Sequence, residues 1–266
     1  MIDINNMTDR SVLADNYKTI DNLSLRKNFH EKYSVNKIGF QRWMFDQYCF
    51  GKNKRILELG SGKGELWDPY FENPELMGMN MEIVLSDLSD GMVEYLDKEY
   101  MNKGIIVKKI DVSDIPYEDG YFDIIIANSM LYHLADIDKA LREIRRVLKK
   151  GGVFYCSTFG INGMTKFLYD ALSELSIPFT NKTNISFTLQ NGEEQLKNVF
   201  DEVERRDYID GLRVDKVEDY VDYIFSMSSL KGLEQSNYEI LLDYFNEKKK
   251  EGYLIIPKEY GIFISR

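Results

Sequence analysis

The sequence predicts an α/β fold built on a mostly parallel sheet. Between residues 55 and 157, short runs rich in β-branched side chains alternate with longer stretches of helical periodicity, which is typical of repeated strand–helix–strand units. One helix is marked by apolar residues at the spacing of a single helical face: Ile137, Ala140, Leu141, Ile144, Val147 and Leu148. Gly151 and Gly152 are expected to end it. The strands expected in this region are 55–59, 82–87, 105–110, 122–127 and 152–158.

The segments on either side of this core are expected to add helices. Residues 1–50 predict an aromatic-rich N-terminal helical lid, and residues 51–266 predict one domain with helical insertions at about 161–200 and 215–250. No repeat, low-complexity tract or linker rich in Pro, Gly or Ser separates further domains. The elements expected after the core are helices around 167–175 and 193–200, a strand at 203–209, two helices within 215–250, and closing strands at 253–256 and 261–265.

Composition excludes several classes of protein. Of 266 residues, 44% are hydrophobic and 29% are charged, which is typical of a globular chain and not of disorder or fibrous repeats. No uncharged apolar stretch approaches the roughly 18 residues that a membrane-spanning helix needs, and the N-terminus has no signal-peptide pattern, so we expect a cytoplasmic protein with no membrane partner. Two cysteines, Cys49 and Cys156, and two histidines show no zinc-site spacing, so no metal is expected.

The acidic balance argues against nucleic acid as a partner. Thirty-four basic and 44 acidic residues leave a net charge of −10, which repels a phosphate backbone at long range. A local cluster of cations near the end of the helix expected at 137–148 suits the negative helix C-terminus, although a local RNA contact stays open as an alternative. This cluster comprises Arg142, Arg145, Arg146, Lys149 and Lys150.

A glycine-rich loop follows the first expected strand, in the run ILELGSGKGELW. Gly60, Gly62 and Gly64 let the backbone turn tightly and approach a ligand at the carboxyl end of that strand, where open α/β sheets usually bind ligands. The second strand ends in Asp87, whose carboxylate can accept hydrogen bonds from the hydroxyls of a ribose. The pattern indicates a nucleoside cofactor, and the alternative is a tight turn that needs glycine for packing alone.

The identity of that cofactor depends on the acidic residues near the loop. A dinucleotide fingerprint would have Gly or Ala at position 65, where this chain has Glu65. Glu58 and Glu65 would also repel a pyrophosphate. S-adenosylmethionine carries an ammonium and a sulfonium and no phosphate, so these carboxylates favour it over NAD. A phosphate-binding lysine loop is excluded because no Gly-Lys-Ser/Thr follows at the required spacing.

Three further runs, VLSDLSDGMVEYL, KKIDVSDIPYEDGYFDIIIANSMLYHL and ALREIRRVLKKGG, resemble the class I S-adenosylmethionine-dependent methyltransferases of the small-molecule, ubiquinone-methyltransferase-like branch. The resemblance covers about residues 53–160. It implies a doubly wound, seven-stranded, mostly parallel Rossmann-like sheet and the cofactor S-adenosyl-L-methionine. Lys150 departs from the family, which usually has Pro there, and we expect only the turn to change.

The resemblance also implies roles for individual residues. Glu58, Gly60, Ser61, Gly62 and Gly64 would surround the methionine part of the cofactor, and Asp87 would bind the ribose. The remaining implied cofactor contacts are Leu88 and Met92 along the ribose and adenine, Asp111 and the Val112 backbone at the adenine, and Asn128 and Ser129 at the reactive end.

The pattern of residues agrees with three of these roles independently. Asp87, Asp111 and Asn128 all fall at carboxyl ends of expected strands, so they should converge at one edge of the sheet. Asp111 could instead cap a turn, and Asn128 could cap the following helix, because both residue types favour those positions.

Methyl transfer from a sulfonium is an in-line displacement, so the protein chiefly aligns the reactants and excludes water. His133 is the candidate general base, with a structural histidine as the alternative. The small-molecule methyl acceptor should be bound outside the shared core, and Tyr17 and Tyr33 are the candidate substrate-binding residues. The competing functions are a nicotinamide-dependent oxidoreductase and a non-catalytic S-adenosylmethionine-binding protein.

Overall fold

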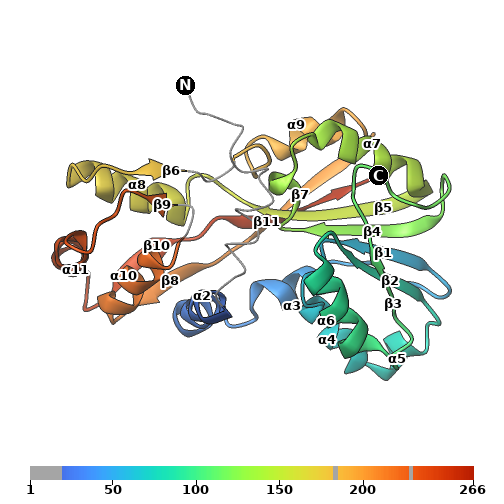
Figure 1. The fold of residues 1–266 in the computed structure, drawn as a ribbon, viewed down its shortest axis with the longest axis horizontal. Coiled ribbons are helices and arrows are strands. Elements are labelled where there is room, and N and C mark those ends of the chain that lie inside the picture. The colour runs from blue at the N-terminus through green and yellow to red at the C-terminus, as the bar shows by residue number, and fades with distance from the viewer. Residues whose placement is uncertain (1–19, 182–184, 228–229) are drawn as a thin grey trace. The chain divides into compact units, whose positions relative to one another are not determined.

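The computed structural model describes residues 20–181, 185–227 and 230–266 (Figure 1). The chain divides into two compact units built from alternating segments. We call the unit of Phe40–Phe159, Ser186–Tyr208 and Tyr260–Arg266 the sheet unit. The accessory unit consists of the residues up to Gly39 together with Gly160–Ile185 and Ile209–Glu259.

A seven-stranded sheet runs through the sheet unit in the order β3-β2-β1-β4-β5-β11-β7. The first five strands in this order are parallel, and β11 runs antiparallel to both of its neighbours. The expected doubly wound, mostly parallel α/β fold is therefore confirmed. The strands are β1 (Arg55–Leu59), β2 (Glu82–Asp87), β3 (Ile106–Lys109), β4 (Phe122–Asn128), β5 (Leu148–Phe159), β7 (Val203–Tyr208) and β11 (Tyr260–Ser265).

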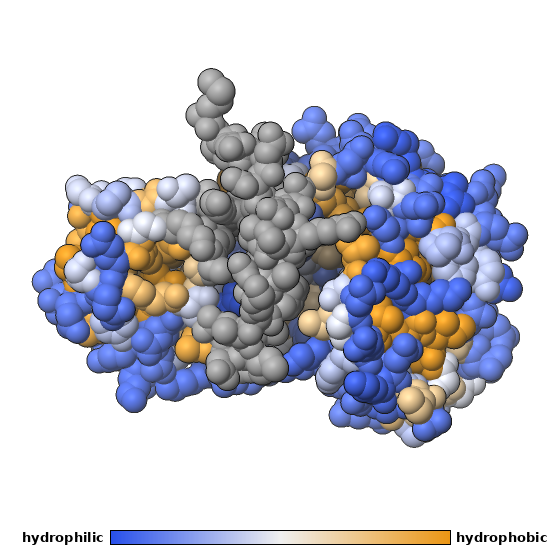
Figure 2. All heavy atoms as spheres, in the orientation of Figure 1, coloured by the Kyte–Doolittle hydropathy of each residue, from blue (hydrophilic) through white to orange (hydrophobic). Residues whose placement is uncertain are grey.

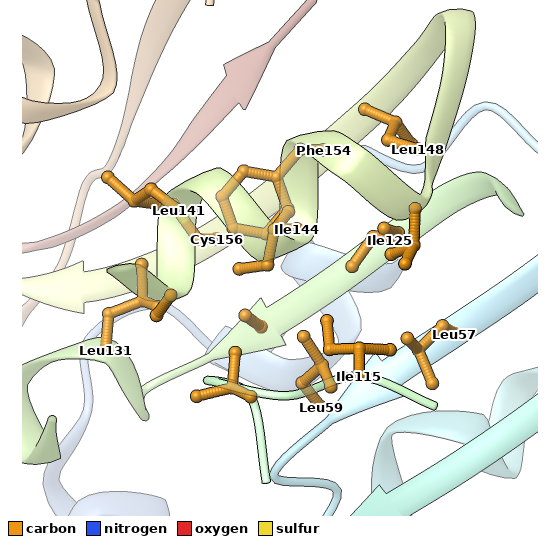
Figure 3. Packing of buried hydrophobic residues seen from close by; sticks show 14 of the residues in the cluster. Leu57, Leu59, Ile115, Ile125, Leu131, Leu141, Ile144, Leu148, Phe154 and Cys156 are labelled. Carbon is orange, nitrogen blue, oxygen red and sulfur yellow. The ribbon is translucent and has the colours of Figure 1, made fainter. Parts of the chain in front are cut away.

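Helices cover both faces of this sheet (Figure 1). The helical segments of the sheet unit are α3 (Phe40–Phe45), η2 (Glu65–Trp67), α4 (Asp68–Phe71), α5 (Pro74–Met77), α6 (Asp90–Tyr100), η3 (Leu131–His133), α7 (Ile137–Val147) and α9 (Gly192–Lys197). On one face, Leu141 and Ile144 of α7 pack with Leu57, Leu59 and Ile125 of the sheet (Figure 3). Strand alternation sends Ile56, Ile124 and Ile126 to the opposite face, where they join a core that includes Trp67 and Tyr48.

The end of α7 differs from the expectation. The helix stops at Val147, and Leu148 already begins β5, opposite Phe122 of β4. The glycines therefore do not end the helix. Gly151 has φ +76°, and a Cβ at Gly152 would lie 2.9 Å from the Asp123 carbonyl, so both glycines serve a bend within the strand. Lys149 and Lys150 are accordingly strand residues, and Lys149 pairs with Asp123 at 2.8 Å.

The accessory unit has its own helical core and two small sheets. The buried side chains of this core include Phe29, Leu172, Tyr220 and Phe245. One expected closing strand belongs here and not to the main sheet, because Leu254–Pro257 pairs antiparallel with an unexpected strand, Gly211–Val214. The elements are α2 (Ile20–Tyr33), α8 (Met164–Glu174), β6 (Thr180–Asn181), β8 (Gly211–Val214), α10 (Val217–Phe225), β9 (Leu230–Lys231), α11 (Asn237–Glu247) and β10 (Leu254–Pro257), with β6 paired to β9.

Hydrophilic residues cover much of the surface visible in Figure 2, with apolar residues gathered in smaller areas. Among the described residues, no helix is both long enough and apolar enough to cross a membrane. The same residues contain no group of three or more His, Cys, Asp or Glu side chains arranged to hold a metal ion.

Candidate cofactor site

The glycine loop is folded over the carboxyl ends of β1 and β2. The Ser61 backbone N–H donates to the Ser86 carbonyl at 2.8 Å, and the Gly62 N–H donates to the Asp87 carboxylate at 3.1 Å. Gly60, Gly62 and Gly64 all have positive φ, between 55° and 74°. The loop conformation therefore requires glycine at three alternate positions.

The three glycines differ in what surrounds them. A Cβ at Gly60 would lie 3.1 Å from Met130, and one at Gly64 would lie 2.7 Å from the Tyr100 ring. At Gly62 a Cβ would meet no described atom within 4 Å. Packing explains Gly60 and Gly64, as the turn alternative supposed, whereas Gly62 leaves an open backbone surface that a ligand can approach.

Asp87 lies at the end of β2, where the cofactor hypothesis needs an acceptor. Its two carboxylate oxygens accept hydrogen bonds from the N–H groups of Gly62 at 3.1 Å and Ser89 at 2.9 Å. Each oxygen can accept a second hydrogen bond, so these contacts orient the carboxylate without exhausting it. Leu88 is 45% exposed beside it, and Met92 is half-buried in the first turn of α6.

Glu58 is sealed beneath the loop. Its side chain is 3% exposed, and its carboxylate accepts a hydrogen bond from the indole N–H of Trp67 at 2.8 Å. Burial raises the pKa of Glu58 from 4.5 to about 7, against the lowering effect of hydrogen bonds from Trp67 and Ser61, while Asp87 raises it further. The site therefore holds a carboxyl group that a nearby positive charge would ionise.

The end of β3 has a mixed outcome. Asp111 is exposed, and its carboxylate accepts hydrogen bonds from the Ser113 N–H at 2.9 Å and the Ser113 hydroxyl at 2.7 Å. The turn-capping alternative is therefore present in the structure. Val112 is buried. Contact of either residue with an adenine ring stays a prediction.

Asn128 lies at the end of β4 and does not cap a helix. The side-chain cap of α7 is Asp136, which accepts from the Lys139 N–H, so the capping alternative for Asn128 is wrong. The Asn128 Nδ2 instead donates to the Tyr48 hydroxyl at 2.7 Å. The Asn128 Oδ1 is buried and has no hydrogen-bond partner among the described residues. Ser129 is exposed with φ +51°, and its N–H donates to Ser157.

His133 belongs to η3, three residues after Met130, the side chain nearest to Gly60. Its ring is half-buried and lies 4.4 Å from the ring of Tyr132, centroid to centroid. Desolvation lowers the pKa of His133, so its imidazole is neutral at pH 7. Within the described part of the chain its ring makes no hydrogen bond that would orient it, and its role as a base stays a prediction.

The two candidate substrate residues lie away from this constellation. Tyr17 is outside the described residues. Tyr33 belongs to the accessory unit and is 4% exposed, because its ring packs on Phe29 and its hydroxyl donates to Asp219 at 2.6 Å. The structure gives Tyr33 a packing role, and its contact with an acceptor has no support here.

Sequence reasoning missed Tyr48 and Trp67 as members of the site. Both were visible only as members of an aromatic-rich stretch or as the end of the loop run. Their contacts with Asn128 and Glu58 span 80 and nine residues of chain, respectively. A separate surface cavity of about 460 Å³ has Tyr48 in its wall, but neither Asp87 nor the glycine loop lines it.

Comparison with known proteins agrees with this geometry. A family model described as a methyltransferase domain matches residues 57–156, which include both the loop and Asn128. This chain carries a methyltransferase domain. The ubiquinone/menaquinone biosynthesis C-methyltransferase UbiE of Proteus mirabilis is 30% identical over 153 residues, covering 55% of this chain and 59% of UbiE. The chain therefore spans less than two thirds of the length of that methyltransferase.

Solved structures extend the likeness to most of the fold. The YcgJ protein of Bacillus subtilis superposes with a TM-score of 0.54 at 17% identity, covering 84% of this chain and 96% of YcgJ. The [4+2]-cyclase SpnF superposes with a TM-score of 0.52 at 15% identity, covering 85% of this chain and 79% of SpnF. At these identities the two structures show the fold of the methyltransferase domain and its surroundings, and nothing about the reaction.

Proposed function

We propose that the protein transfers a methyl group from S-adenosyl-L-methionine to a nitrogen, oxygen or carbon atom of a small molecule. The observation that carries the proposal is the combination of an open Gly62 backbone with acceptor groups on both sides of it. Asp87 lies on one side, and the buried Glu58 carboxyl and the unpaired Asn128 oxygen lie beneath the loop and beyond it.

The donor set fits this cofactor better than it fits a dinucleotide. Buried acceptors without a cationic partner suit a ligand that brings its own ammonium and sulfonium. A pyrophosphate would meet the Glu58 carboxyl, whose pKa is already raised by burial. The match of residues 57–156 to a methyltransferase domain supports the same choice, and no comparison supports a nicotinamide-dependent oxidoreductase or a binding protein without activity.

We assign the cofactor-binding residues as follows. Asp87 holds the ribose hydroxyls, with Leu88 and Met92 along the nucleoside and Asp111 and Val112 at the adenine. Glu58, the loop of Gly60, Ser61, Gly62 and Gly64, and Asn128 with Ser129 surround the methionine part. When bound, the cofactor supplies an electrophilic methyl group, and these residues orient it and keep water away.

The acceptor belongs to the class of small organic molecules. UbiE is named for methylation at carbon in quinone biosynthesis, but the match covers only part of its length, so the target atom of this protein is a separate question. We propose that the accessory unit supplies acceptor selectivity and that residues 1–50 contribute to it, because the matched domain lies wholly within the sheet unit.

Calorimetry with S-adenosylmethionine, S-adenosylhomocysteine and NAD tests the proposal. We expect binding of the first two in the micromolar range and none of NAD. Transfer of a labelled methyl group from S-adenosylmethionine to members of a panel of small amines, phenols and carbon acids then tests activity. Binding of NAD without S-adenosylhomocysteine would overturn the proposed function.

A further inference from the structure

Tyr48 fixes the orientation of one amide at the candidate site. This tyrosine follows α3, and its hydroxyl is 2.7 Å from the Asn128 Nδ2. Its ring is buried and meets the Tyr155 ring edge-on at 4.9 Å between centroids. Because burial raises the pKa of Tyr48 well above 10, its hydroxyl is neutral at every physiological pH.

The contact leaves one atom of Asn128 without a partner. An asparagine side chain offers one acceptor oxygen and one donor amino group, and here the donor is committed to Tyr48. The Oδ1 is buried and meets no donor among the described residues. An unpaired buried carbonyl costs about 1–3 kcal/mol, so such atoms usually belong to a binding site.

The same face of the sheet carries the buried carboxyl of Glu58. In the register of β1 and β4, Glu58 pairs with Ile126, and Asn128 projects to the same face because it is two residues further along β4. Glu58 is close enough to Tyr48 to raise the pKa of the tyrosine. Two acceptors, an amide oxygen and a carboxyl group, therefore face one region in which the chain supplies no cation of its own among these contacts.

We infer that Tyr48 is a positioning residue that turns the Asn128 oxygen toward the ammonium group of the methionine part of the cofactor. The inference rests on the proposed function and adds to it a residue outside the matched domain, since Tyr48 precedes residue 57. An ammonium offers three N–H donors, which satisfies the amide oxygen and the Glu58 carboxyl together. Without the Tyr48 hydroxyl the amide is free to rotate and present its amino group instead, which repels a cation.

Binding of three ligands separates this role from simple packing. S-adenosylhomocysteine has an ammonium and a carboxylate, its decarboxylated analogue keeps only the ammonium, and 5′-methylthioadenosine has neither. We expect Tyr48→Phe to weaken binding of the first two by about three- to tenfold, the value of one hydrogen bond, and to leave 5′-methylthioadenosine unchanged. Calorimetry at one temperature measures all three.

Two further variants control the experiment. Tyr155→Phe removes another buried hydroxyl, which accepts from the Cys49 N–H at 3.1 Å, so it should cost stability without selecting among the ligands. Asn128→Leu removes the amide while keeping its size, and in this background Tyr48→Phe should have no further effect on ammonium binding.

Several outcomes would overturn the inference. An equal loss for all three ligands in Tyr48→Phe would make the tyrosine merely structural. A loss confined to the ligand with a carboxylate would mean that the amide amino group is presented and that the carboxylate is recognised. Failure of the unmodified protein to bind any of the three ligands would instead refute the proposed function itself.

Discussion

Glu58 shows how a single residue couples ligand binding to pH. Its carboxyl is buried under Trp67, and burial raises its pKa to about 7, so the folded protein holds the proton more tightly than the unfolded chain does. This proton linkage stabilises the folded state below the unfolded pKa of 4.5, and the benefit is lost as pH rises through about 7. The difference corresponds to something on the order of 3 kcal/mol.

We expect the thermal stability of the ligand-free protein to fall between pH 5 and 8, and affinity for S-adenosylhomocysteine to rise over the same range. A cationic ligand favours the ionised carboxyl, so binding releases a proton. Thermal melts with and without ligand measure both trends. Glu58→Gln, which cannot ionise, should flatten them, and an unchanged pH dependence in that variant would assign the effect to another group.

Asp87 combines a proposed ligand contact with a structural one. Because its carboxylate accepts from the Gly62 and Ser89 N–H groups, Asp87→Ala should weaken S-adenosylhomocysteine binding by about fivefold to 150-fold and also lower the melting temperature. Asp90→Ala is the matched control, because Asp90 is 77% exposed and makes only a surface ion pair with Lys109. Equal affinity losses in both variants would show that Asp87 is not a ligand contact.

At the scale of elements, the loop between β1 and η2 makes a prediction that separates strain from ligand contact. Gly62 and Gly104 both have positive φ, 55° and 72°, and a Cβ at either position meets no described atom. Val should therefore strain both turns similarly. We expect Gly62→Val to abolish S-adenosylmethionine binding because its side chain enters the space above the loop, while Gly104→Val keeps binding intact.

Calorimetry on both variants, after circular dichroism has shown that they are folded, checks this prediction. Full cofactor affinity in a folded Gly62→Val protein would contradict the assignment of the loop. Loss of binding in both variants would point to general destabilisation.

At the scale of the whole molecule, the chain passes between the two units at residues 39/40, 159/160, 185/186, 208/209 and 259/260. This interleaving changes how the lid hypothesis must be tested. Deleting residues 1–40 would remove Phe29 and Tyr33 from the accessory core and Ser34 from its contacts with Asp210 and Lys258. A deletion would therefore damage the accessory unit whether or not a lid exists.

Hydrogen exchange on the intact chain avoids that problem. We expect S-adenosylhomocysteine to slow exchange in the loop at 60–64 and after β4, and, if residues 1–50 help to close the site, in α2 as well. Unchanged exchange in α2 in the presence of both cofactor product and an accepted substrate would place acceptor recognition elsewhere.

The sequence by itself determined the local features of the sheet unit. The bounds of β1 and β2 agree with the residues expected, because a short apolar run followed by Gly or by a polar turn needs no distant information. The loop of three glycines and the position of Asp87 followed from the same local chemistry. The methyltransferase resemblance came from runs of adjacent residues.

Only the tertiary structure decided features that depend on distant partners. Leu148 continues the helical pattern of α7, yet pairing with Phe122 takes it into β5. Strand 254–257 has the pattern of a closing strand but pairs with 211–214 in the accessory unit. Tyr48 meets Asn128 across 80 residues, and Tyr33 is buried by its own unit. In each case the free energy comes from burial and hydrogen bonds between segments far apart in the chain, which local periodicity does not contain.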